Sequence, residues 1–166
     1  MTSIGVGRYV CLQTPGWLGA IIRWSTHSRY NHALIAGPGG LCAEATPRGV
    51  RITNLSRYSR HLACANLGEP MTAQQGAQVW AAAEAMAGAP YNFPDLLAIG
   101  LGDLGWHWKA LIWLAGNDHA FICSQMVALA GKAAGLDWMC RDTSADQVTP
   151  AALALRKGVV PVTITG

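Results

Sequence analysis

The sequence has few charged residues, and no uninterrupted run of like charges longer than two residues. Only 13% of its 166 residues are Asp, Glu, Lys or Arg, whereas 51% are hydrophobic. Because disordered chains combine high charge with low hydrophobicity, this composition argues against disorder and predicts one domain over residues 1–166 with a single core. The net charge of +3 is too small, and too evenly spread, to predict nucleic-acid binding.

Acidic residues are scarcest near the N-terminus, where Glu44 is the only acidic residue between Met1 and Arg60. The same region holds the one local basic cluster, which consists of Arg48, Arg51, Arg57 and Arg60. We interpret these arginines as a solvated loop and strand face. They do not change the prediction that nucleic acid is not a partner.

The cysteines lack the patterns of a disulfide framework or a zinc site. There are five of them, an odd number, without a Cys-x-x-Cys pair or a Cys/His ligand spacing. Free thiols suit a reducing compartment. We therefore expect no structural metal, and we predict no cofactor.

No apolar run is long and uninterrupted enough to predict a transmembrane span. The longest apolar region, residues 96–116, contains Asp103, His107 and Lys109. Its tryptophans are typical of an irregular core segment, and a lid that contacts a membrane surface is the alternative. The N-terminus has no signal-peptide pattern, so we expect a protein that is cytoplasmic at synthesis, or delivered by another route. The Ala-, Gly- and Trp-rich composition would suit a high-GC actinobacterial host or its phage.

Extended residue patterns dominate the first 67 positions. Residues 8–14 have strand-like composition, and the runs at 31–37 and 41–47 flank a Pro-Gly-Gly turn, which predicts a β-hairpin. Because side chains alternate along a strand, His32 shares a face with Leu34 and Ala36, and Glu44 lies on the facing strand. Residues 49–55 and 61–67 are typical of two further strands.

In the N-terminal half two helices carry start signals. Thr14 followed by Pro15 predicts a short helix with Thr14 as its cap. Thr72 and Gln75 form a capping-box pattern at the start of the clearest helix, for which Gly88 is the expected stop.

The C-terminal half contributes two more helices and a strand. A helix is predicted within residues 117–135, and Thr149 with Pro150 starts a shorter one. The last run, 159–165, is a strand whose proline favours a sheet edge. The order of elements predicts an α+β fold, with a mostly antiparallel sheet or small barrel packed against helices.

Cys123 stands close to the start of its predicted helix. A helix N-terminus lowers the pKa of a thiol through the helix dipole and its free N–H groups, and a nearby imidazole lowers it further. The same N–H groups can hold an oxyanion. The alternative is a small buried hydrophobic residue, which is what most free cysteines are.

A nucleophilic thiol needs a base, and His32 is the candidate because a strand holds the ring in one orientation. His119 is nearer in sequence, but we interpret it as a polar residue of the loop that leads into the helix. Glu44 on the facing strand can accept a hydrogen bond from His32 and orient it. The alternative for Glu44 is a solvated charge on the sheet.

These motifs resemble a known family. The segments RYNHALIAGPGGLCAEATPRGVRI, PYNF, FICSQMVALAGKAAGL and TPAAL are similar to the circularly permuted NlpC-type branch of papain-like cysteine hydrolases. In that branch a strand His, an acid, an aromatic turn and a Cys-Ser at a helix start follow in the order found here. The resemblance covers nearly the whole chain and implies a permuted papain-like fold.

The resemblance also implies roles for individual residues. Cys123 would be the nucleophile, His32 the base and Glu44 the residue that orients His32. Tyr91 and Ser124 would lie at the oxyanion or substrate-binding site. Two departures weaken any transfer of substrate, because Gln125 and Arg8 stand where the family often has acidic residues.

Three functions remain open at this point. The first is a thiol hydrolase, of peptidase, amidase or esterase type, acting through an acyl-enzyme on an acyl, peptide or lipid-like substrate. The second passes the same acyl group to an amine or alcohol, as an acyltransferase. The third is a binding or assembly module on the same fold. The oligomeric state is not predicted.

Overall fold

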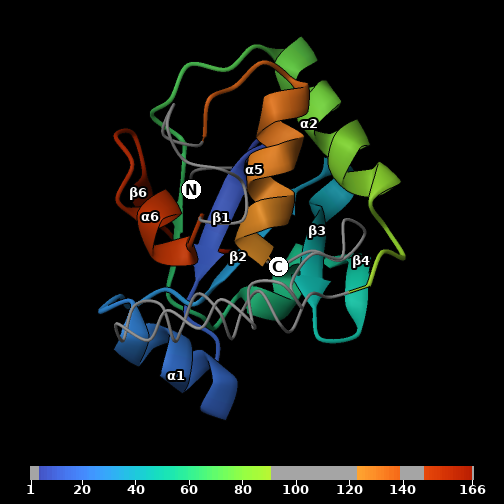
Figure 1. Cartoon of the computed structure of the whole chain (residues 1–166). Helices are drawn as coiled ribbons and strands as arrows, with labels where there is room; N and C mark the ends of the chain where they lie inside the picture. The colour runs from blue at the N-terminus through green and yellow to red at the C-terminus, as the bar shows by residue number, and fades with distance from the viewer. Residues whose placement is uncertain (1–3, 91–122, 139–147, 166) are drawn as a thin grey trace, which may run out of the picture.

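The fold was analysed in a computed structural model, which describes residues 4–90, 123–138 and 148–165. Its strands form one antiparallel sheet in the order β4-β3-β2-β1-β5-β6 (Figure 1). They are β1 (Tyr9–Leu12), β2 (His32–Ala36), β3 (Leu41–Thr46), β4 (Gly49–Asn54), β5 (Ala63–Ala65) and β6 (Val160–Val162). Within the described residues β4 and β6 are edge strands, so the sheet is open. The predicted α+β class is confirmed, and the barrel alternative is wrong.

Helices cover the sheet mainly on one face. They are α1 (Trp17–Ser25), α2 (Ala73–Ala85), α5 (Cys123–Ala133) and α6 (Pro150–Ala154), with short 3-10 helices η1 (Pro38–Gly40) and η2 (Leu55–Tyr58). The helices α2 and α5 lie side by side over β2 and β3, while α1 lies at the lower end of the view (Figure 1). Within the described residues no helix is long and apolar enough to span a membrane.

The alternation of side chains along the strands divides the core into two clusters. Residues such as Ala33 and Ile35 of β2 pack with α2 and α5 on one face. Leu34, between them, belongs to the cluster on the opposite face. On the α5 face a Cβ on Gly131 would lie 2.4 Å from the Trp138 ring, so any larger residue here would require the ring or the helix to shift.

Two tight connections fix the register of the strands around the site. The Pro-Gly-Gly turn pairs Leu34 with Glu44, and the next turn pairs Glu44 with Arg51. Gly49, at that second turn, has a φ of +107°, and a Cβ there would lie 2.7 Å from the carbonyl of Ala89. The central strand of the three therefore places Glu44 between β2 and β4.

The helix starts agree with the sequence signals in two cases out of the three described. The capping box of Thr72 and Gln75 is present, and Thr149 caps α6. The expected cap at Thr14 is wrong, because Gly16 is the N-cap of α1 and no side chain caps it. Thr14 is engaged elsewhere: its N–H and its hydroxyl are both hydrogen-bonded to the buried side chain of Asn31.

Candidate active site

The start of helix α5 brings Cys123 to the start of strand β2. Cys123 is the first described residue of α5 and is only 4% exposed. The helix packs on β2, whose first residue is His32. The side chains of Cys123 and His32 are hydrogen-bonded to each other. A thiol and an imidazole separated by ninety-one positions in the chain (123 minus 32) are therefore in direct contact.

The second nitrogen of the same imidazole is bound to Glu44. His32 Nε2 lies 2.8 Å from Glu44 Oε2, which confirms the contact predicted across the hairpin. Since Nε2 is committed to the carboxylate, Nδ1 is the ring atom that faces the thiol. The His32 side chain is 13% exposed and that of Glu44 is 1% exposed, so this chain of contacts is nearly closed to bulk water.

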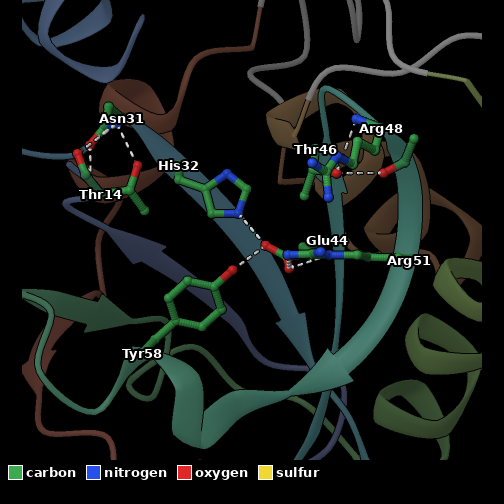
Figure 2. A network of polar contacts seen from close by, with 9 residues as sticks. Thr14, Asn31, His32, Glu44, Thr46, Arg48, Arg51 and Tyr58 are labelled. Carbon is green, nitrogen blue, oxygen red and sulfur yellow. Dashed lines mark hydrogen bonds and ion pairs between the residues drawn. The ribbon is translucent and has the colours of Figure 1, made fainter. Parts of the chain in front are cut away.

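Glu44 is held by two further donors that converge on it from β4 and η2 (Figure 2). Arg51 places Nε at 2.9 Å and Nη2 at 2.8 Å from Oε1. The hydroxyl of Tyr58 donates a hydrogen bond to Oε2, the oxygen that also contacts His32. Each carboxylate oxygen therefore has two contacts, which is what a buried carboxylate needs to remain charged.

These contacts keep Glu44 ionised and His32 protonated. Burial raises the pKa of Glu44, but hydrogen bonds and charge from His32, with help from Tyr58 and Arg51, outweigh it and lower the pKa to about 2. Burial lowers the pKa of His32, but its hydrogen bonds to Cys123 and Glu44 raise it to about 9. At neutral pH the pair is thus a carboxylate and an imidazolium.

The imidazolium in turn favours the thiolate form of Cys123. Burial raises the pKa of this thiol, whereas the hydrogen bond and charge of His32 lower it, and the net direction is down. The backbone N–H groups of Ala33 and Ser124 are hydrogen-bonded to the sulfur and lower the pKa further. A low-pKa thiolate beside an imidazolium is the arrangement of a nucleophilic cysteine.

The structure places three of the five predicted site residues together, namely Cys123, His32 and Glu44. Ser124 is adjacent, but its hydroxyl is buried and donates to the carbonyl of Val148, which joins α5 to the start of α6. Ser124 contacts the sulfur of Cys123 through its backbone N–H instead. The oxyanion role expected of Ser124 stays a prediction, and Tyr91 lies outside the described residues.

Sequence reasoning missed Arg51 and Tyr58. Arg51 does lie on a partly solvated face, with its side chain 41% exposed, but its guanidinium also pairs with the buried carboxylate of Glu44, which the sequence interpretation did not include. The signal was available: the short turn after Thr46 pairs Glu44 directly with Arg51. Tyr58 had no such signal, because it lies on a 3-10 helix whose position depends on the tertiary fold.

Among the described residues, no group of three or more His, Cys, Asp or Glu side chains is arranged to hold a metal ion. At the site itself, both oxygens of Glu44 and Nε2 of His32 are already engaged with one another or with Arg51 and Tyr58. The donor set around Cys123 therefore does not fit a metal.

Comparison with known proteins identifies a relative in fold. No family model matches the chain, and no curated protein matches it. Among solved structures it is similar to the metalloprotein yiiX of Escherichia coli O157:H7, described as DUF1105. The two share 16% identity at a TM-score of 0.65, over 95% of this chain and 96% of that one. At this identity the similarity concerns the fold alone.

These findings overturn the family assignment made from the short motifs. The similarity is to a DUF1105 protein, and no family model supports the NlpC-type assignment. That assignment is therefore wrong, and it no longer supports the roles that it implied for individual residues. The contacts among Cys123, His32 and Glu44 remain, since they are observed in this chain itself.

Proposed function

We propose that this protein is a cysteine hydrolase, of peptidase, amidase or esterase type, in which Cys123 is the nucleophile. The observation that carries the proposal is the continuous contact from thiol to imidazole to buried carboxylate. Each group has the protonation state that the reaction requires, because Glu44 is ionised and the pKa of His32 is raised to about 9. Structural cysteines have no need of an imidazole partner.

In the proposed reaction the Cys123 thiolate attacks the acyl carbon of an amide or ester. A carbon–sulfur bond forms, and the carbonyl electrons move to oxygen, where N–H groups at the start of α5 hold the charge. Collapse of this intermediate breaks the bond to the leaving group, which takes the proton of His32 Nδ1. Water then attacks the acyl-enzyme and gives a proton to His32. The acid is released, and Cys123 is again a thiolate.

A metal has no place in this proposal. The yiiX protein is described as a metalloprotein. Here the candidate ligands are engaged with each other, and no suitable group exists among the described residues. Every step is therefore assigned to protein side chains and water.

The proposal is tested by alkylating the protein with iodoacetamide across a range of pH and measuring each cysteine by mass spectrometry. Cys123 of the wild type is expected to react well below the pH at which an ordinary thiol ionises, and His32→Ala is expected to remove this low-pH reactivity. Cys42 is the internal control, since it is also buried and burial raises the pKa of its thiol to about 12. If Cys123 reacts no faster than Cys42 at low pH, and if its rate is unchanged in His32→Ala, the protein has no activated nucleophile.

A second measurement tests the acyl-enzyme. After brief incubation with p-nitrophenyl acetate, Cys123 is expected to carry an acetyl group that disappears in water and does not form in His32→Ala. If the acetyl group is lost only after an amine is added, the reaction is acyl transfer to the amine and not hydrolysis. Absence of acetylated Cys123, despite rapid alkylation, would leave a binding module as the better description.

A further inference from the structure

The surroundings of Glu44 contain more than is needed to orient His32. One donor pair, from Arg51, occupies Oε1, while Oε2 is shared between His32 and the hydroxyl of Tyr58. A carboxylate that only oriented an imidazole would need no second donor on the oxygen that touches the ring. The shared oxygen indicates that the charge of Glu44 is divided among three partners.

We infer that Arg51 and Tyr58 are positioning residues that share the charge of Glu44 with His32, and so limit how tightly Glu44 retains the imidazole proton. This inference rests on the proposed function, because the retained proton matters only if His32 must deliver it to a leaving group. Arg51 and Tyr58 touch neither the sulfur nor any reacting atom in that reaction. They act through Glu44.

The physical reason is competition for one negative charge. When His32 is neutral, the hydrogen bonds from Arg51 and Tyr58 to Glu44 are strongest. When His32 is protonated, Arg51 and Tyr58 compete with the imidazolium for the same carboxylate charge. Compared with a site in which Glu44 has no other partner, Arg51 and Tyr58 therefore favour the neutral form of the His32 imidazole. Removal of either donor is therefore expected to raise the pKa of His32.

Several titratable groups lie near Glu44. They come from every neighbouring element: His32 from β2, Cys42 from β3 itself, Arg51 from β4 and Tyr58 from η2, with Cys123 of α5 acting through His32. Cys42 does not compete, because burial, with a smaller contribution from the charge of Glu44, raises the pKa of its thiol to about 12. His61 packs edge-on against Tyr58, with ring centroids 5.4 Å apart, and contacts Tyr58 rather than the carboxylate.

The inference is tested by measuring the pKa of His32 by NMR in the full chain with isotope-labelled histidine, assigned by comparison with His32→Gln. Tyr58→Phe keeps the ring that packs near His32, 6.2 Å between centroids, and removes only the hydroxyl. Arg51→Met removes the charge, and Arg51→Lys restores it with a simpler donor. Tyr30→Phe and Arg48→Met are the matched controls. Tyr30 bonds Cys64, and Arg48 is exposed in the turn between β3 and β4.

The expected result is an upward shift of the His32 pKa of about 0.5 to 1 in Tyr58→Phe and more in Arg51→Met. Arg51→Lys is expected to lie closer to the wild type, and the controls should titrate as the wild type does. A purely structural role would lower the stability of the variants without raising this pKa. An unchanged or lowered His32 pKa in Tyr58→Phe therefore refutes the inference, even if Arg51→Met does not fold.

The same samples separate this inference from the proposed function. Cys123 alkylation is measured in each of them. If Cys123 of the wild type is not activated, the proposed function fails and the role assigned to Arg51 and Tyr58 fails with it. If Cys123 is activated and His32 titrates alike in wild type and variants, the hydrolase proposal stands and the charge-sharing inference alone is wrong.

Discussion

Replacement of Glu44 by Gln is the most informative single change, because the charge of this buried side chain is coupled to both ends of the site. The pKa of Glu44 is lowered from 4.5 to about 2 in the folded protein. At about 1.4 kcal/mol for each tenfold change in an equilibrium, this corresponds to roughly 3 kcal/mol of stability. The pKa of His32 is raised from 6.5 to about 9, which is again roughly 3 kcal/mol. The hydrogen bond to Cys123 contributes most to raising the pKa of His32, and the His32–Glu44 interaction is counted in both figures, so they do not add.

The signs of the two effects define a pH window. The contribution of Glu44 is present above its unfolded pKa and is lost as the pH falls toward about 2. The contribution of His32 is present below 6.5 and is lost as the pH rises through about 9. The wild type is therefore expected to be most stable between these limits, near pH 5 to 6, as far as this pair is concerned.

The assay is urea unfolding at pH 6 and pH 9.5, followed by circular dichroism. Glu44→Gln is expected to lower the free energy of unfolding at pH 6 by about 3 kcal/mol, and by much less at pH 9.5. Glu84→Gln, on the exposed side of α2, is the matched control and is expected to unfold as the wild type does at both pH values. Equal destabilisation of Glu44→Gln at both pH values would show that the ionised pair contributes nothing, and would refute the reasoning.

Three further predictions concern single positions. In His32→Ala, the rate of Cys123 alkylation at pH 6 is expected to fall about tenfold or more, because the imidazolium no longer stabilises the thiolate. Gly131→Ala places a Cβ 2.4 Å from the Trp138 ring and is expected to lower the unfolding free energy by about 1–3 kcal/mol, measured in urea. Thr72→Ala removes the N-cap of α2 and is expected to lower the unfolding free energy by about 1 kcal/mol in the same assay. For either variant, an unchanged urea midpoint would contradict the structural role assigned to the residue.

The contact between His32 and Glu44 was predictable because local rules determine it. Side chains alternate along a strand, and the Pro-Gly-Gly turn sets the pairing of Leu34 with Glu44. The same rules, applied to the next turn, would have identified Arg51. The interpretation stopped at the solvated face, whereas a buried carboxylate needs donors, and a neighbouring arginine can supply them while its own side chain stays partly exposed.

Other parts of the site depend on the tertiary fold. No local pattern relates Cys123 to His32, and the family resemblance that suggested their contact is not supported as an assignment. Tyr58 approaches Glu44 only because η2 returns across the end of the sheet. Thr14 looked like a helix cap, but the buried amide of Asn31 binds its N–H and hydroxyl. A long-range contact of this kind overrides a local capping signal.

The position of His32 at the first residue of β2 explains how the site joins both faces of the sheet. Ala33 packs on the α5 face, whereas Leu34 and its partner Glu44 belong to the opposite face. By alternation His32 shares the face of Glu44, and from the end of the strand its ring also reaches Cys123. A slip of one residue in the β2–β3 pairing would turn Glu44 toward α5 and separate it from the imidazole. The activation of Cys123 therefore depends on the register that the Pro-Gly-Gly turn imposes, as well as on the three residues themselves.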